Sequence, residues 1–471
     1  MAALFFINIE AHFYPAEARG IACPRNRTFE AHHSPSQLIS LLLVVIYLAL
    51  FVWLIRSRDF FQCAGLSRNM VSGLFLLKFG FGMLLYAVYA YYYAAERHYT
   101  DAFRYFDDAG VLFSALKDQP MYYFQLLTGI GGDADLLKPY TDAMAFWDRP
   151  YSYGTFNDNR TMIRLNAVLY LFSFGHYHVH TAFWCFFSMI GLVGIYKTFA
   201  GLLPKARWLL VAAIFLVPSV LFWGSSVLKE GLLLGGLGLF VYHFVKLVQQ
   251  FSVARLLGLL GLLFFLLVIK TYVLMALVPG MLSYLLVARL RSRRPLVVYA
   301  ITHVVLVLLA LNLHHVLPSY NITRYIALKQ RDFINTSMKH KPGSFFEMSQ
   351  MEQSATSIIA HVPQGLMNGL LRPFPQDANS LLMVAASAEN IGVLLLLIAC
   401  LVLMRSWREM PGNALLFCAS FALVLIVLVG LVTPIAGALV RYKIPAIPFL
   451  LIAGLLMLNA DRLPTLIKSN P

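Results

Sequence analysis

The sequence predicts an all-α membrane protein: a polytopic bundle of about 11–12 transmembrane helices with two long extracytoplasmic segments. Of its 471 residues, 59% are hydrophobic and only 13% are charged, whereas soluble domains carry about 25% charged residues. Several apolar runs are roughly 20 residues long, which is the length that a helix needs to cross a bilayer. Outer-membrane barrels instead show stretches of about ten residues with alternating polarity, and the sequence lacks them. In lipid the apolar runs must therefore be helices, because a helix satisfies its own backbone hydrogen bonds.

The apolar runs also give the expected order of segments. The N-terminal segment 1–36 receives no functional assignment. The next parts are two spans within 37–94, an acidic outer loop with interfacial helices over 95–160, a transmembrane core over 161–316, a second outer loop over 317–386, closing spans within 387–460 and a tail over 461–471. The individual spans are expected at about 37–54, 71–94, 181–200, 207–223, 227–247, 256–270, 272–288, 296–316, 387–404, 413–432 and 437–458.

The orientation of these spans depends on one short apolar run, 162–174. It has roughly 13 residues, fewer than a full crossing needs. If this run does not cross, the short basic loops all lie on one side of the membrane, as the positive-inside rule requires. Those loops are 56–70, 197–207, 246–255, 289–294, 405–408 and the tail 461–471. We therefore expect 162–174 to be a re-entrant or partial helix, with both long polar segments outside.

Charge and motifs exclude several classes of function. The net charge of +15 does not indicate a nucleic-acid partner, because most Lys and Arg residues lie in the short loops beside the spans. Neither GxGxxG nor GxxxxGK[ST] is present, so nothing favours a nucleotide-driven reaction. The five cysteines show no paired spacing, which argues against a disulfide framework or a zinc site. We expect a multi-pass protein surrounded by membrane lipids, in a bacterial inner or plasma membrane rather than the endoplasmic reticulum.

The first outer loop is rich in acids: about 94–160 contains ten of the chain's 22 Asp and Glu residues. Within it, the predicted helix 99–113 (YTDAFRYFDDAGVLF) carries Asp101, Asp107 and Asp108. Asp101 and Asp108 share a helical face with Arg104. They therefore form either surface salt bridges with Arg104, each contributing about 0.3–0.5 kcal/mol to stability, or part of a site. Asp107 lies off that face. It is therefore the preferred catalytic base, with Asp101 or Asp108 assisting.

Basic and polar residues gather at the outer ends of the later spans and in the second outer loop. The candidates for binding a substrate or its phosphate are Lys229, Glu230, Lys270, Arg441, Tyr442, Arg324 and Arg372. Each also has a structural explanation, as an exposed pair at a helix end, a helix cap, an interfacial anchor or a solvated loop charge. Charges at membrane depth are costly, however, and usually face a cavity. Release of a phosphate leaving group needs a base for the acceptor proton and positive charge on the phosphate, which this set of residues supplies.

Three stretches resemble the GT-C superfamily of integral-membrane glycosyltransferases, which includes the protein O-mannosyltransferase and lipid A aminoarabinose transferase families. They are YTDAFRYFDDAG (99–110), PSVLFWGSSVLKEGL (218–232) and RYKIPAIPFLL (441–451), the last similar to an R-Y-x-x-P-x-x-P opening of a late span. The resemblance implies a polyprenyl-phosphate-linked sugar donor, a lipid or saccharide acceptor and an outer-loop Asp acting as base or metal contact. It leaves no cofactor certain and a divalent cation as an additional candidate. One departure is that the acidic loop follows the second span here, whereas in the family it follows the first.

Two other functions remain open. Polysaccharide polymerases or ligases of the Wzy/EpsG type have similar spans and outer loops, and would also serve cell-envelope polysaccharide synthesis. A transporter or flippase for lipid-linked saccharides would instead show broken helices near the middle of the membrane and an internal repeat. In the transferase hypothesis, Asp107 activates the acceptor, while Lys229 and Arg441 hold the phosphate.

Overall fold

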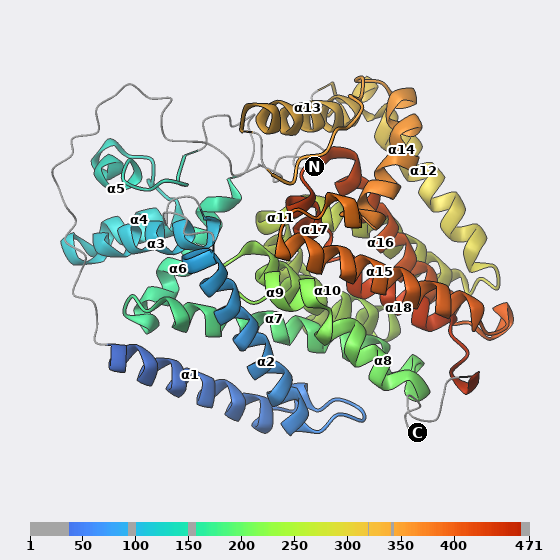
Figure 1. Ribbon diagram of the computed structural model, residues 1–471, viewed down its shortest axis with the longest axis horizontal. Helices are drawn as coiled ribbons and strands as arrows, with labels where there is room; N and C mark the ends of the chain where they lie inside the picture. Colours follow the sequence, from blue (N-terminus) through green and yellow to red (C-terminus); the bar gives the residue numbers. More distant parts are fainter. Residues whose placement is uncertain (1–36, 93–99, 149–156, 319, 341–342, 463–471) are drawn as a thin grey trace.

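The computed structural model describes residues 37–92, 100–148, 157–318, 320–340 and 343–462, which form an all-α bundle without β-strands in these ranges (Figure 1). Eight helices are long and apolar enough to cross a membrane, and the bent pair α17–α18 adds a ninth candidate. The eight are α1 (Gln37–Ser57), α2 (Arg68–Ala87, continued by the π-helical turn Val88–Tyr92), α7 (Tyr177–Phe199), α10 (Lys229–Gln249), α11 (Val253–Leu290), α12 (Pro295–Val316), α15 (Leu381–Val402) and α16 (Gly412–Val432). The predicted fold class is thus confirmed, and the chain is a multi-pass membrane protein.

Two predicted spans are present as interrupted helices. The run 207–223 forms α8 (Arg207–Val211), the π-helical turn η9 (Ala212–Leu216) and α9 (Pro218–Trp223). The break lies before Pro218, which lacks an N–H and forces Val217 into an extended conformation. The run 437–458 forms α17 (Ala436–Lys443) and α18 (Ile447–Met457), bent by 60°. Both interruptions bring polar backbone groups into the bundle.

Helix α11 contains a sharp break and runs as two arms, which correspond to the predicted spans 256–270 and 272–288. Lys270 has the non-helical backbone angles φ −154° and ψ 88°. It contacts Glu230 in the first turn of α10. Gly258 and Tyr284, one in each arm, both lie beside the C-terminal end of α10. The arms 253–269 and 271–290 therefore run in opposite directions along α10, with Lys270 at their turn.

The short basic loops gather at one end of the bundle. Lys197, near the end of α7, donates to the carbonyl of Phe60 in the α1–α2 loop at 2.8 Å. Lys205, before α8, pairs with Asp461 near the C-terminus at 2.6 Å. A cavity at this end is lined by the ends of α7, α10 and the second arm of α11 together with the start of α16. By the positive-inside rule we infer that this end is cytoplasmic.

Helix α6 (Asp158–Ser173) does not carry the chain across the bundle. At its start, Asp158 contacts Lys229. Just after its end, the hydroxyl of Tyr177 lies 3.1 Å from that of Ser226. The start of α6 and the start of α7 thus both lie beside the segment 226–229, whereas Phe172 near the end of α6 accepts a hydrogen bond from Tyr47 within α1. These contacts agree with a partial helix at 162–174, which stays a prediction, and α6 is not among the helices long and apolar enough to cross a membrane.

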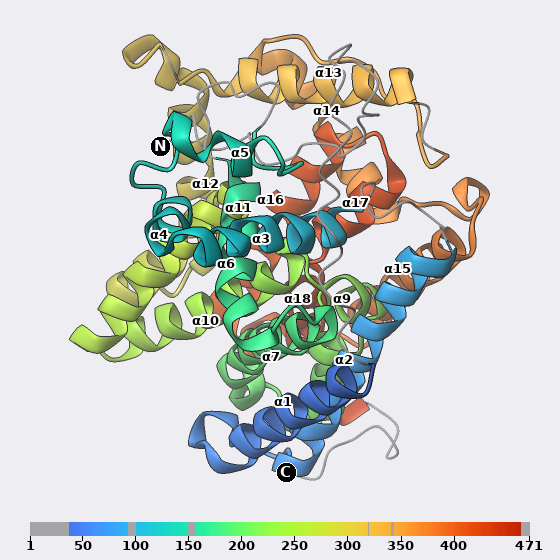
Figure 2. The same ribbon diagram turned by 90° about the vertical axis from the view of Figure 1, so that its left-hand side faces the viewer.

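Five helices cover the opposite, outer end. They are α3 (Asp101–Asp118), α4 (Pro120–Thr128), α5 (Lys138–Thr141), α13 (Ile322–His340) and α14 (Ala355–Leu371). Figures 1 and 2 show α13 across the end of the molecule opposite the C-terminus, with α5 below it and α3 and α4 nearer the middle of the views. The described helices of the two long polar segments therefore lie on the side of the bundle away from the basic loops.

We predict that a cysteine replacing Arg293, an exposed residue in a basic loop, is labelled by a membrane-impermeant maleimide only after the membrane is permeabilised. A cysteine replacing Arg331, exposed on α13, should be labelled in intact cells. The unmodified chain gives the background, because its described cysteines are buried. Labelling of the cysteine at position 293 in intact cells would show that the orientation is the opposite one.

Candidate functional site

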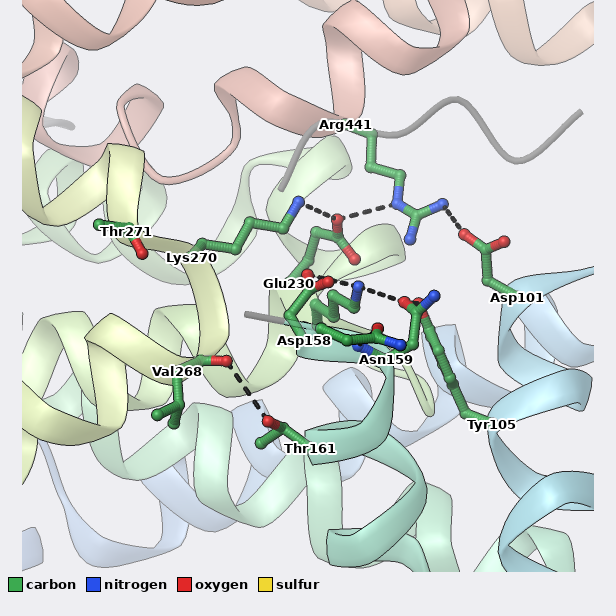
Figure 3. A network of polar contacts seen from close by, with 12 residues as sticks. Asp101, Tyr105, Asp158, Asn159, Thr161, Glu230, Val268, Lys270, Thr271 and Arg441 are labelled. Carbon is green, nitrogen blue, oxygen red and sulfur yellow. Dashed lines mark hydrogen bonds and ion pairs between the residues drawn. The ribbon is translucent and has the colours of Figure 1, made fainter. Parts of the chain in front are cut away.

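Four elements that are distant in the sequence bring charged side chains together at the outer end (Figure 3). Arg441 of α17 donates from Nη1 to Asp101 of α3 at 2.8 Å. Its Nε lies 2.9 Å from Oε1 of Glu230 in α10. Lys270, at the break of α11, reaches the same Oε1 at 3.4 Å. We call these four residues the outer ion network.

Helix ends explain why these charges are tolerated where they lie. Asp101 and Glu230 are in the first turns of α3 and α10, where the helix dipole favours negative charge. Arg441 is in the last turn of α17, where the dipole favours positive charge. Thr100 occupies the predicted N-cap position of α3 with an extended backbone. The local sequence thus places three of the four charges, those of Asp101, Glu230 and Arg441, at helix termini.

The break in α11 positions Lys270 and is itself supported by hydroxyl groups. The hydroxyl of Thr271 donates to the carbonyl of Leu267 at 2.9 Å. From α6, Thr161 donates to the carbonyl of Val268 at 3.4 Å, as Figure 3 shows. Backbone groups released by a kink need such partners inside a membrane protein. The Lys270 ammonium then lies 4.6 Å from the ring centroid of Tyr442, a cation–π contact.

The outer ion network is deeply buried and electrically balanced. Glu230 is 1% exposed and Lys270 3%, whereas the side chain of Arg441 is 16% exposed. Two cations face two carboxylates, so each charge has an opposite neighbour. Removing one member of such a group leaves an uncompensated buried charge, which typically costs about 3–5 kcal/mol. Arg441 is the most accessible member and therefore the one that an incoming anion reaches first.

Several buried polar atoms around this network lack hydrogen-bond partners among the described residues. They are Oε2 of Glu230, the hydroxyl of Tyr272 and Nε of Arg441. The Arg441 Nε group is close to Glu230 as an ion pair, but its N–H is not aligned for a hydrogen bond. Native proteins leave few buried polar atoms unsatisfied. The network can therefore accept further hydrogen bonds from a ligand.

A second polar cluster holds Lys229, which was predicted to bind phosphate. Its ammonium contacts Asp158 at 2.5 Å and Asn159 at 2.6 Å, and all three residues are buried. The hydroxyl of Tyr105 donates to Asn159 at 3.0 Å. Lys229 and Glu230 are thus not an exposed pair, because each enters a different buried cluster. A phosphate-binding role for Lys229 stays a prediction, and its contacts tie α6 to α10.

The three predicted carboxylates of α3 have different surroundings. Asp101 meets Arg441, as described above. Asp108 accepts hydrogen bonds from the backbone amides of Ala145 and Phe146 at 2.9 and 2.8 Å, so it holds the loop that contains these two residues. Asp107 is half-buried and lies about 100° around the helix from Asp108. The carboxylate facing the cations is therefore Asp101, and the structure favours it over the Asp107 preferred from the sequence.

Asp108 should make the stability of the protein depend on pH near 6. Burial raises the pKa of Asp108 from 3.8 to about 6, although its two amide donors oppose the shift. Between these values the folded chain binds more protons at this carboxyl than the unfolded chain, so its contribution to stability falls as the pH rises through 6. We expect Asp108→Asn to be more destabilising at pH 5 than at pH 7.5, by about 1–2 kcal/mol. Urea unfolding of purified protein at the two pH values checks this, and a pH-independent cost would contradict it.

Arg324 and Arg372, the predicted loop cations, lie outside the outer ion network. Arg372 pairs with Asp377 at 2.7 Å, and its guanidinium lies 4.0 Å from the ring centroid of Phe346. Arg324 is exposed on α13, and its side chain makes no ion pair with another described residue. The surroundings of Arg324 and Arg372 therefore fit charges of surface loops, and the two residues do not form a site together. Tyr442, in contrast, packs on Lys270 within the network.

Some polar residues of the bundle were not singled out from the sequence. Lys443 donates to the carbonyls of Gly369 and Arg372 at 3.3 and 3.0 Å, and so caps the C-terminal end of α14. Glu389 of α15 accepts from the amide and hydroxyl of Ser219, both at 2.6 Å, at the start of α9. The sequence signal that could have identified Lys443 and Glu389 is an ionisable residue inside an apolar span. These two charges hold the interrupted helices in place, whereas Tyr272, Asp158, Asn159 and Tyr105 line the clusters above.

Comparisons with protein-family models, with curated proteins and with solved structures found no match. Among the described residues, no three His, Cys, Asp or Glu side chains are grouped so that they could hold a metal ion. The divalent cation therefore stays a prediction. The functional argument rests on the geometry of the outer ion network.

Proposed function

We propose that this chain is a membrane glycosyltransferase that moves a sugar from a polyprenyl-phosphate donor to an acceptor at the extracytoplasmic face. The observation that carries the proposal is the outer ion network itself. Two cations, Arg441 and Lys270, lie among buried carboxylates at the end opposite the basic loops. A lipid-linked donor reaches such a site from the bilayer and needs no soluble nucleotide-sugar pocket.

Each charged group fits a role in this reaction. The planar guanidinium of Arg441 suits a phosphate with two parallel hydrogen bonds, and Lys270 adds a second positive charge. When these cations turn towards the donor phosphate, Asp101 loses its Arg441 partner and becomes a stronger proton acceptor. Asp101 then takes the proton of the acceptor hydroxyl as its oxygen attacks the anomeric carbon. The bond from that carbon to the phosphate oxygen breaks, and polyprenyl phosphate leaves with the electron pair.

The test is a vesicle assay with the purified full-length chain. Vesicles carry a polyprenyl phosphate with a radiolabelled sugar, and lipid and saccharide acceptors are supplied. The proposal expects label on the acceptor together with an equal amount of released polyprenyl phosphate. Addition of one sugar distinguishes a transferase from a Wzy/EpsG-like polymerase or ligase, which would join longer units. If no donor in a panel of polyprenyl-phosphate sugars is cleaved, the proposal fails.

A transporter or flippase for lipid-linked saccharides is the second candidate, because two interrupted helices approach the site. The interruptions lie before α9 and between α17 and α18. Discontinuous helices of this kind form the substrate sites of many transporters. In the same vesicles, a transporter would move the labelled donor between leaflets without cleaving it, which separates the two functions.

A further inference from the structure

We propose that Oε2 of Glu230 and the hydroxyl of Tyr272 form a subsite for a sugar hydroxyl group, next to the cations assigned to the phosphate. This inference rests on the proposed function, because it takes the ligand of the outer ion network to be a lipid-linked sugar. It adds that a sugar hydroxyl of the ligand is recognised as well as the phosphate, and that Tyr272 is a residue that recognises it.

The first argument is that the two carboxylate oxygens of Glu230 are used unequally. Oε1 meets both cations, Lys270 at 3.4 Å and Arg441 at 2.9 Å. Oε2 is buried and has no hydrogen-bond partner among the described residues. An unsatisfied buried acceptor typically costs about 1–3 kcal/mol. One strong acceptor in the middle of the site is thus left without a hydrogen-bond partner from the part of the chain that the structure describes.

The second argument is that another unpartnered group lies beside the same ion pair. The hydroxyl of Tyr272 is buried without a partner among the described residues, and Tyr272 is 1% exposed. The Lys270 ammonium lies 5.6 Å from the Tyr272 ring centroid. The same ammonium lies 3.4 Å from Oε1 of Glu230. Tyr272 and Glu230 thus both lie beside the Lys270 ammonium, and each brings one unpartnered polar atom to this cluster.

The chemistry of these atoms selects the ligand group. An ionised carboxylate only accepts hydrogen bonds, whereas a tyrosine hydroxyl both donates and accepts. A sugar hydroxyl can donate to Glu230 and accept from Tyr272, which satisfies both. A phosphate oxygen cannot take this place, because it would bring negative charge against the carboxylate. The phosphate and the hydroxyl of one ligand are thus directed to different parts of the network.

Access to the subsite passes through Arg441. Its side chain is 16% exposed and lies between Asp101 and Glu230, whereas Glu230 is 1% exposed (Figure 3). When the guanidinium turns to a phosphate, it leaves Glu230 and opens the space beside Oε2. Phosphate binding and sugar recognition are therefore linked steps, with the phosphate engaged first.

The test is the variant Tyr272→Phe in the purified full-length chain. Affinities are measured for bare polyprenyl phosphate and for polyprenyl phosphates carrying a neutral hexose, an aminopentose or an N-acetylhexosamine. The wild type should bind at least one sugar-bearing lipid more tightly than the bare lipid. Tyr272→Phe should reduce that preference about tenfold, because one hydrogen bond is lost, and leave binding of the bare lipid unchanged. Tyr284→Phe, farther along the same arm and beside Phe244 near the C-terminal end of α10, should change neither affinity.

Thermal unfolding completes the test. Because the Tyr272 hydroxyl has no hydrogen-bond partner among the residues that the structure describes, its removal should leave the melting temperature unchanged or raise it. A large loss of stability would mean that the hydroxyl serves the fold, and would overturn the subsite. An unchanged sugar preference in Tyr272→Phe, or no preference in the wild type, would also overturn it. If bare polyprenyl phosphate still binds in those cases, the proposed function stands, whereas failure of every lipid phosphate to bind removes both.

Discussion

Replacing Arg441 by Ala should abolish sugar transfer and destabilise the protein by about 3–5 kcal/mol. The guanidinium contacts Asp101 and is one of the two cations on Glu230, so its loss leaves more negative than positive charge in the buried outer ion network. We expect donor binding to fall below detection in a lipid-phosphate binding assay, with a clear drop in the midpoint of urea unfolding. Arg324→Ala, which removes an exposed cation of α13, is the matched control and should alter neither quantity.

A double variant separates the two effects of Arg441. Arg441→Met combined with Asp101→Asn removes one cation and one anion, and leaves Lys270 paired with Glu230. Replacing a buried ion pair as a unit costs much less than removing one partner. Stability should therefore return towards that of the wild type while donor binding stays lost. Recovery of donor binding together with stability would show that Arg441 serves only the fold.

Asp101→Asn should lower the rate of transfer by about 10²–10⁴, the usual contribution of a positioned general base. The amide keeps the shape of the side chain but cannot take the acceptor proton. Donor binding should change only a few-fold, because Arg441 and Lys270 are retained. Single-turnover transfer rates measured beside donor affinity distinguish these quantities.

Asp107→Asn is the companion to this experiment, because the sequence favoured Asp107 and the structure favours Asp101. The two carboxylates are on the same helix, so both variants test the same local change. We expect Asp107→Asn to retain most of the transfer rate. If Asp107→Asn is inactive and Asp101→Asn is active, the assignment from the ion pair with Arg441 is wrong.

Much of the fold was predictable because bilayer thickness and backbone hydrogen bonding leave few options for long apolar runs. The position of the basic loops also predicted that 162–174, now in α6, does not cross the membrane, and the contacts of α6 agree with that prediction. The interruption before Pro218 depended on tertiary support, since Glu389 from a distant helix caps the start of α9. The sequence alone gave no means to pair these two segments.

The candidate site was predicted less completely, for a related reason. Residue type and helix position indicated that Asp101, Glu230, Lys270 and Arg441 would lie at the outer end. Their pairing could not be inferred, because helix geometry offered Asp101 only Arg104 on its own helix, as one of two alternatives, whereas Arg441, which it contacts, is 340 residues away. Helix periodicity identifies only the neighbours of a residue on the same helix face. A buried charge, in contrast, pairs with a residue of whichever helix packs against it in the fold.

The central claim is tested most directly by determining the structure of the full-length chain in lipid nanodiscs with bare polyprenyl phosphate. The account predicts the phosphate at the outer end, within hydrogen-bond distance of Arg441 and Lys270, with Arg441 turned away from Glu230. A phosphate bound at the basic end, or a ligand-bound structure in which Arg441 keeps both carboxylates as partners, would contradict it.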